Sequence, residues 1–221
     1  MAYRRLPNTD KARLTAIVRL NELLVIEESN LLNNHQEAIG GLKIVFEELI
    51  DRRNEFVTKR RVLNKTKRDL LVKLRLYVSH FLQVFNFAID REDILKESRA
   101  FFKLETNTGV IPSLSKEIDV IKWANNIVNG EQKRIEQGIE AISHPRFTRI
   151  KEIKEASEKI MDELLDLEKS IEDYYPEIIE QRTRIDVFIK QIWNKIEFQF
   201  VNEPIEIKRK KATHFGVVYV Q

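Results

Sequence analysis

The sequence predicts an all-α fold, and three observations lead to this prediction. Apolar residues recur at helical spacing over most of the 221 residues. Glycine and proline number only 6 and 5, so few positions interrupt a helix. The segment 70–89, LLVKLRLYVSHFLQVFNFAI, is apolar on nearly every side of a helix, which requires cover on more than one side. We therefore expect this segment to be the central helix of the domain.

The order of the helical segments predicts an antiparallel four-helix bundle of two long helical hairpins. In a single helical domain of residues 1–221, we expect hairpin one at 38–90, a connecting helical region at 91–148, hairpin two at 149–203 and a tail at 204–221. Asn64 and the capping-box sequence TKRD after it favour a break in hairpin one. Asp173, three residues before Pro176, favours a break in hairpin two. Positions 42, 49, 56, 63, 70, 77 and 84 stay in heptad phase, so one continuous helix remains the alternative.

The chain also carries signals for helix starts, for a strand and for a repeat. Asn8 or Thr9 is expected to cap the first helix, which runs to about Asn33, and Ser113 or Ser115 to cap the helix that ends near Gly138. The ending VVYVQ predicts a short C-terminal strand, with the arm around Tyr3 as its nearest partner. Residues 82–86 and 190–194 are similar at an offset of 108, which indicates a weak internal duplication.

Charge is distributed unevenly, although the formal net charge is only +3. Residues 52–75 are mainly basic and residues 152–180 mainly acidic, which favours two helices that face each other. The alternative is a nucleic-acid-binding protein that uses a basic patch on the helix tip 58–68, together with the run 208–211. The residues of this patch are Lys59, Arg60, Arg61, Lys65, Lys67 and Arg68.

Motifs for catalysis, metal binding and cofactor binding are absent from the sequence. Cysteine is missing, which excludes disulfides and thiolate sites. The sequence has no Glu-x-x-His pair, His-Glu-x-x-His, phosphate-binding loop or Gly-x-Ser-x-Gly. We therefore predict no catalytic, metal or cofactor residues. His80, Gln83 and Asn86 predict a buried polar cluster on the central helix, and a ligand or enzymatic site in a bundle cavity near His80 is a less favoured alternative.

Four segments of the chain, YRRLPNTD, YVSHFLQVFNFAI, NGEQKRI and HFGVVYV, together resemble an uncharacterised family of bacterial all-helical proteins of about this length. The resemblance implies a helical fold for essentially the whole chain, and it implies no activity and no site residues. The sequence lacks a signal peptide and a membrane-spanning run, so we expect a cytoplasmic protein without membrane insertion. Long charged amphipathic helices without catalytic motifs favour a non-enzymatic interaction or scaffold protein, whose partner is a protein or a second copy of the chain.

Overall fold

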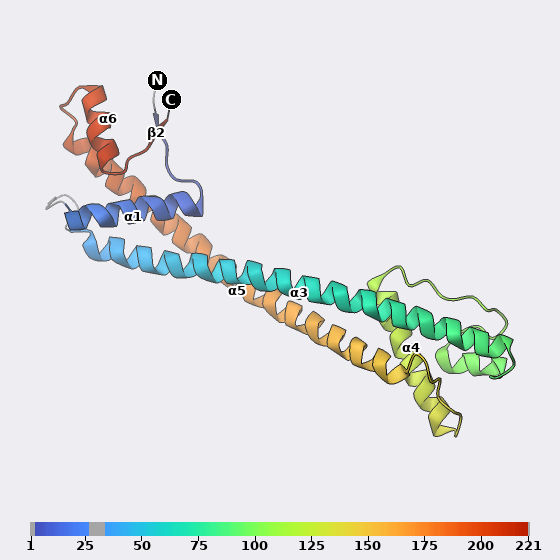
Figure 1. The fold of residues 1–221 in the computed structure, drawn as a ribbon. Coiled ribbons are helices and arrows are strands. Elements are labelled where there is room, and N and C mark those ends of the chain that lie inside the picture. The colour runs from blue at the N-terminus through green and yellow to red at the C-terminus, as the bar shows by residue number, and fades with distance from the viewer. Residues whose placement is uncertain (1–2, 27–33, 221) are drawn as a thin grey trace. The chain divides into compact units, whose positions relative to one another are not determined.

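The computed structural model describes residues 3–26 and 34–220, and its helices confirm the all-α class (Figure 1). The described elements, in chain order, are β1 (Tyr3–Arg4), α1 (Asp10–Ile26), α3 (Gln36–Asp90), the 3-10 helix η1 (Lys96–Phe102), α4 (Glu117–Glu136), α5 (Phe147–Gln199), α6 (Ile205–His214) and β2 (Tyr219–Val220). The predicted end of the first helix near Asn33 lies outside the described residues. Within the described part of the chain, no helix is long and apolar enough to cross a membrane.

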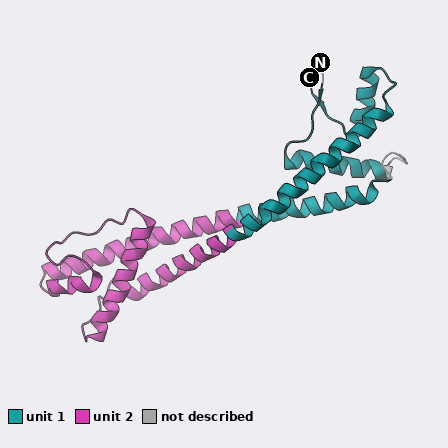
Figure 2. Cartoon of the chain, turned by 180° about the vertical axis from the view of Figure 1, so that it is seen from behind, with its two compact units in different colours: residues 1–58, 169–221 teal, residues 59–168 magenta. Residues whose placement is uncertain are grey.

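Two compact units divide the chain, and each has its own apolar core (Figure 2). Unit 1 contains Met1–Thr58 and Lys169–Gln221, and unit 2 contains Lys59–Glu168. The core of unit 1 is built from α1, the first part of α3, the last part of α5, and α6. The core of unit 2 is built from the last part of α3, η1, α4 and the first part of α5. Each unit thus combines segments that are far apart in the sequence.

The predicted break at Asn64 is wrong, because α3 is a single helix of 55 residues. The Asn64 side chain donates its Nδ2–H to the carbonyl of Arg60 one turn earlier, at 2.9 Å, and Thr66 donates to Val62 in the same way. Both residues therefore bond inside the helix instead of ending it. Leu63, at a heptad position, is buried, and this burial favours the continuous alternative.

The predicted break at Asp173 is also wrong, because α5 runs through Pro176 as a helix of 53 residues. A proline inside a helix removes one backbone hydrogen bond and crowds the preceding turn. The burial of residues just before and just after Pro176 in the sequence offsets this cost. Tyr174 and Ile178 are buried in the core of unit 1, and the Tyr174 hydroxyl donates to the carbonyl of Leu49 on α3 at 2.9 Å. The two predicted hairpins therefore correspond to two uninterrupted helices.

The cover expected for residues 70–89 exists on some sides of the helix but not on all of them. Phe81 and Phe85 are completely buried, and both rings contact Phe102 of η1 edge to face, with ring centroids 5.6 and 4.7 Å apart. Leu76 and Phe87, in contrast, are 65% and 61% exposed. The segment is therefore central to unit 2, and one of its faces remains open to solvent.

The chain ends and one of the two predicted helix starts form as expected. β1 pairs antiparallel with β2, which places Tyr3 opposite Val220 and Arg4 opposite Tyr219, so the predicted strand and its partner are confirmed. Thr9 accepts a hydrogen bond from the backbone N–H of Ala12 through its Oγ1 at 3.2 Å, which confirms it as the cap of α1. The predicted serine cap of α4 is wrong, because the helix begins after Lys116, which makes no side-chain capping bond.

Candidate interaction surfaces

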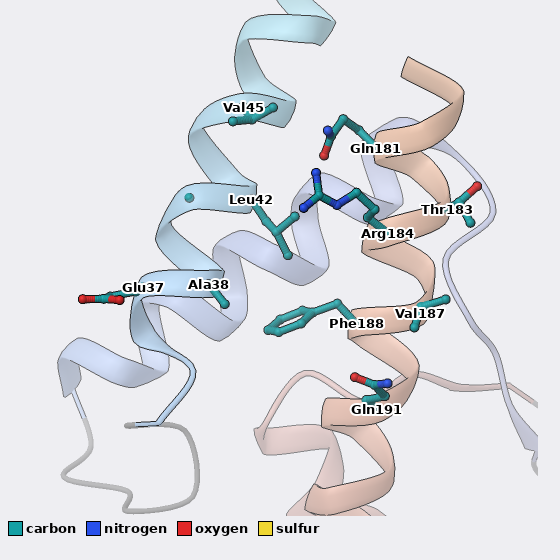
Figure 3. Close-up of a pocket in the computed structure, with 11 residues that line it drawn as sticks. Glu37, Ala38, Leu42, Val45, Gln181, Thr183, Arg184, Val187, Phe188 and Gln191 are labelled. Carbon is teal, nitrogen blue, oxygen red and sulfur yellow. The ribbon is translucent and has the colours of Figure 1, made fainter. Parts of the chain in front are cut away.

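An open apolar groove lies in unit 1 between α3 and α5. Its volume is about 650 Å³. Figure 3 shows Leu42 from α3 and Phe188 from α5 pointing into the space between the two helices, with Arg184 beside them, while Glu37 points away. The residues that line this groove are Glu37, Ala38, Gly41, Leu42 and Val45 of α3, and Gln181, Thr183, Arg184, Val187, Phe188 and Gln191 of α5.

Helical spacing brings the apolar lining residues to one side of each helix. Ala38, Leu42 and Val45 follow one another at four and three residues on α3, so their side chains share a face. Leu42 and Phe188 are half-buried and pack against the closed core of unit 1. Val45 and Val187 are 39% and 51% exposed. The groove therefore has a packed floor and apolar rims that water reaches.

Two adjacent glycines lie near the start of α3, one of them at the groove. Gly41 lines the groove, and a Cβ added to Gly40 or to Gly41 would meet no atom within 4 Å. A glycine inside a helix costs about 0.5–1 kcal/mol relative to alanine. No neighbouring atom among the described residues requires a glycine at either position. The backbone of α3 is therefore bare at this edge, where another chain can approach closely.

The predicted buried cluster of His80, Gln83 and Asn86 does not form. His80 and Gln83 are exposed, and the Gln83 side chain donates to Ser79 on its own helix. The error arose because η1 and α4 cover the face of α3 that carries Phe81 and Phe85, and they leave the adjacent face open. A catalytic or ligand site in an interior cavity around His80 is therefore not supported. The open face of α3 carries the exposed residues Val72, Leu76, His80, Gln83 and Phe87.

Asn86 bonds to the segment that follows α3. It is half-buried, and its side-chain N–H donates to the carbonyl of Gly109 at 2.9 Å. Its Oδ1 accepts a hydrogen bond from the buried Arg99, which also donates to the carbonyl of Glu105 at 2.6 Å. Asn86 therefore anchors the connection between η1 and α4 rather than a ligand.

Unit 2 contains a buried ion pair that no sequence pattern predicts. Glu131 and Arg134 of α4 are 0% and 1% exposed and bond to each other. Glu131 also accepts the backbone N–H of Ile142 at 3.2 Å. The Arg134 guanidinium lies over the rings of Phe85 and Phe102, at 5.9 and 6.0 Å from their centroids. Since neither side chain is accessible to solvent, the pair holds the segment after α4 and is not placed to bind a substrate.

The predicted basic patch is partly neutralised within unit 2. Arg60 pairs with Glu168 and Lys67 with Glu117, each at 2.9 Å. In unit 1, Arg52 of the basic block pairs with Glu177 of the acidic block. The Arg60–Glu168 and Arg52–Glu177 pairs confirm that the two blocks face each other. The patch residues that are exposed and form no ion pair with any described residue are Lys59, Arg61, Lys65 and Arg68.

Side chains of the basic run 208–211 also make contacts within their own unit, unit 1. Arg209 lies over the ring of Tyr219 at 5.8 Å, and Lys211 pairs with Glu203 and lies 5.4 Å from the ring centroid of Phe200. Lys208 is half-buried, and only Lys210 and Lys211 are exposed. The run therefore contributes contacts within its own unit.

Metal chemistry and comparison with known proteins assign no function to the chain. Among the described residues, no group of three His, Cys, Asp or Glu side chains is placed to hold a metal ion. No protein-family model, curated protein or solved structure matches the chain.

Proposed function

We propose that this chain is a non-enzymatic cytoplasmic interaction protein that binds an amphipathic helix of a partner protein in the groove of unit 1. The observation that carries the proposal is the open apolar groove between α3 and α5, with Leu42 and Phe188 at its floor. An amphipathic helix buries its apolar face in such a groove through side chains at i, i+3, i+4 and i+7. The partner is another protein or a second copy of this chain.

Three features of the groove support a helix as its occupant. Its two walls are themselves helices, so a third helix can pack against both. Gly41 lines the groove and has no side chain, so it permits close approach, as small residues do at many helix crossings. Polar and charged side chains, Glu37, Gln181, Arg184 and Gln191, accompany the apolar ones and can meet the polar face of an incoming helix.

A pair of matched substitutions tests the proposal. Val45 and Val57 are both exposed valines of α3 in unit 1, but only Val45 lines the groove. A tagged full chain carrying Val45→Asp should lose the proteins that the natural chain retains from its own cells, and it should lose self-association if the partner is a second copy. Val57→Asp should retain both. Equal retention by the two variants, with unchanged circular dichroism, would contradict the proposal.

Nucleic-acid binding is a second candidate, supported by Lys59, Arg61, Lys65 and Arg68, which are exposed and not ion-paired with described residues. Binding through phosphate contacts would weaken steeply with salt, because each contact releases counterions. Retention of DNA or RNA at low salt that disappears in the triple variant Arg61→Glu, Lys65→Glu, Arg68→Glu would support this candidate. Absence of DNA and RNA binding at low salt would exclude this candidate function.

We also infer that the chain arose by duplication of one helical module. The order α1, α3, η1 repeats as α4, α5, α6. Adding 108 to the bounds of α1 and α3 gives 118–134 and 144–198, close to those of α4 and α5. Three buried apolar positions of α3 match buried apolar positions of α5 at this offset: Phe81 with Ile189, Phe85 with Trp193, and Ala88 with Ile196. Each unit would then combine parts of both modules.

A further inference from the structure

We propose that a second cavity in unit 1 binds a small amphipathic molecule that has an apolar body and one anionic head group. The cavity lies between the N-terminal arm, α1 and the segment after α6, and it shares no lining residue with the groove. Its volume is about 640 Å³, within the range of small-molecule sites, roughly 300–1,000 Å³. The proposal does not depend on the function proposed for the groove.

The walls of this cavity are fixed by backbone pairing. The N–H of Arg5 donates to the carbonyl of Val218 at 2.9 Å, and this bond continues the pairing of β1 with β2. Gly216, with φ +89°, turns the chain after α6 towards β2. The apolar lining residues are Leu6, Pro7, Ala12, Ala16, Trp193, Val218 and Val220. A preformed apolar wall of this kind suits the hydrocarbon part of a ligand.

Trp193 lies at the wall of this cavity and carries an unpaired hydrogen-bond donor. Its side chain lines the cavity, is only 1% exposed, and its indole Nε1–H has no hydrogen-bond partner in the described part of the chain. A buried donor without an acceptor is unfavourable, and native proteins rarely leave one unpaired.

The charges around the cavity favour an anionic head group. Arg5, Lys11 and Arg19 line the cavity, and none of its lining residues is an aspartate or glutamate. The side chains of Arg5 and Lys11 make no ion pair with any described residue. Arg19 makes two long contacts, 3.3 Å to the carbonyl of His214 and 3.4 Å to Glu22. All three cations can therefore turn to a carboxylate or a phosphate.

The full chain with Trp123→Phe provides a direct readout, because Trp193 is then its only tryptophan. We expect saturable changes in Trp193 fluorescence on titration with decanoate or decyl phosphate, and the tighter binder of the two identifies the head group. Decanol and decylammonium should bind at least tenfold more weakly. Absence of a saturable change with both anions would overturn the proposal, and equal binding of decanol would overturn the requirement for an anion.

Charge reversal separates this site from binding elsewhere on the surface. Lys11→Glu should weaken decanoate binding at least tenfold. Lys190→Glu, at an exposed position of α5 outside the cavity lining, should leave the affinity unchanged. Ala12→Phe, which fills the cavity, should abolish binding, whereas Ala156→Phe on the exposed surface of unit 2 should not. Circular dichroism confirms the fold of each variant, and equal affinities of Lys11→Glu and Lys190→Glu would contradict the site.

Discussion

Arg182 of α5 binds Asp10, the first residue of α1, through two parallel hydrogen bonds, Nε to Oδ1 at 2.8 Å and Nη2 to Oδ2 at 2.6 Å. Arg53 of α3 donates to the Asp10 carboxylate as well, at 3.0 Å. Arg13 of α1 makes a second bidentate pair, with Asp186 of α5. One carboxylate therefore links three helices of unit 1. This network fixes the start of α1, which forms a wall of the second cavity.

Replacement of this carboxylate should destabilise the protein. Asp10→Asn removes the charge that pairs with three arginines, Arg182, Arg53 and Arg13, and we expect a loss of about 1–3 kcal/mol in the free energy of unfolding. Asp51→Asn, at an exposed position of α3, serves as the control and should change it by less than about 0.5 kcal/mol. Urea denaturation measures both. Hydrogen bonding to Arg182 holds the pKa of Asp10 below its usual value, so its contribution is present above about pH 4 and is lost as the pH falls through the lowered pKa.

His35 should make the protein less stable in mild acid. Burial, together with the positive charge of Lys195 at 2.8 Å from its Nε2, lowers the pKa of His35 from 6.5. As the pH falls through 6.5, the unfolded chain takes up this proton before the folded chain does, so the free energy of unfolding decreases. The fall in urea midpoint between pH 7.5 and 5.5 should be smaller for His35→Asn than for the natural protein. An equal fall in both proteins would refute this role of His35.

Two glycines inside helices should respond oppositely to alanine. A Cβ at Gly130 would lie 2.5 Å from Cδ1 of Phe102 and 2.8 Å from the carbonyl oxygen of Phe101, so Gly130→Ala should destabilise unit 2 by about 1–3 kcal/mol. A Cβ at Gly40 would meet nothing, so Gly40→Ala should stabilise the protein by about 0.4–1 kcal/mol. Thermal unfolding of the two variants checks both signs. A stabilising Gly130→Ala would show that α4 does not pack closely on η1.

A cut in the loop between η1 and α4 should leave the two halves associated. Residues 105–110 are exposed, and each unit contains segments from both sides of this loop. Residues 1–108 and 109–221, co-expressed as separate chains, should therefore copurify with the helical content of the intact protein. Size-exclusion chromatography with circular dichroism measures this. Halves that each fold alone as stable monomers would be inconsistent with the two units.

Much of the fold could be predicted from local patterns. Helical spacing identified α1, α3, α4 and α5, the ending VVYVQ identified β2, and Thr9 was one of the two expected caps of α1. The breaks at Asn64 and Asp173 were predicted wrongly, because capping propensity is local whereas the burial of Leu63 and Tyr174 depends on packing by distant segments.

The candidate sites could be predicted far less well. The exposure of His80 depends on which face of α3 is covered by the segment that follows α3. The sequence of one helix does not determine which of its faces a later segment covers. The Glu131–Arg134 pair has the spacing of an ordinary surface pair, so its burial gave no sequence signal. Leu42 and Phe188 both line the groove but lie far apart in the sequence, and only the tertiary structure brings them together.

Photo-crosslinking from inside the groove tests the central claim most directly. The photoreactive amino acid p-benzoylphenylalanine is placed at Val45 or Val187 in the groove, or at Val57 outside it, and cells that produce the full chain are irradiated. Binding of a partner helix predicts one discrete crosslinked product shared by positions 45 and 187 and absent at position 57. No product at either groove position, or the same products at all three positions, would contradict the proposal that this groove binds a partner.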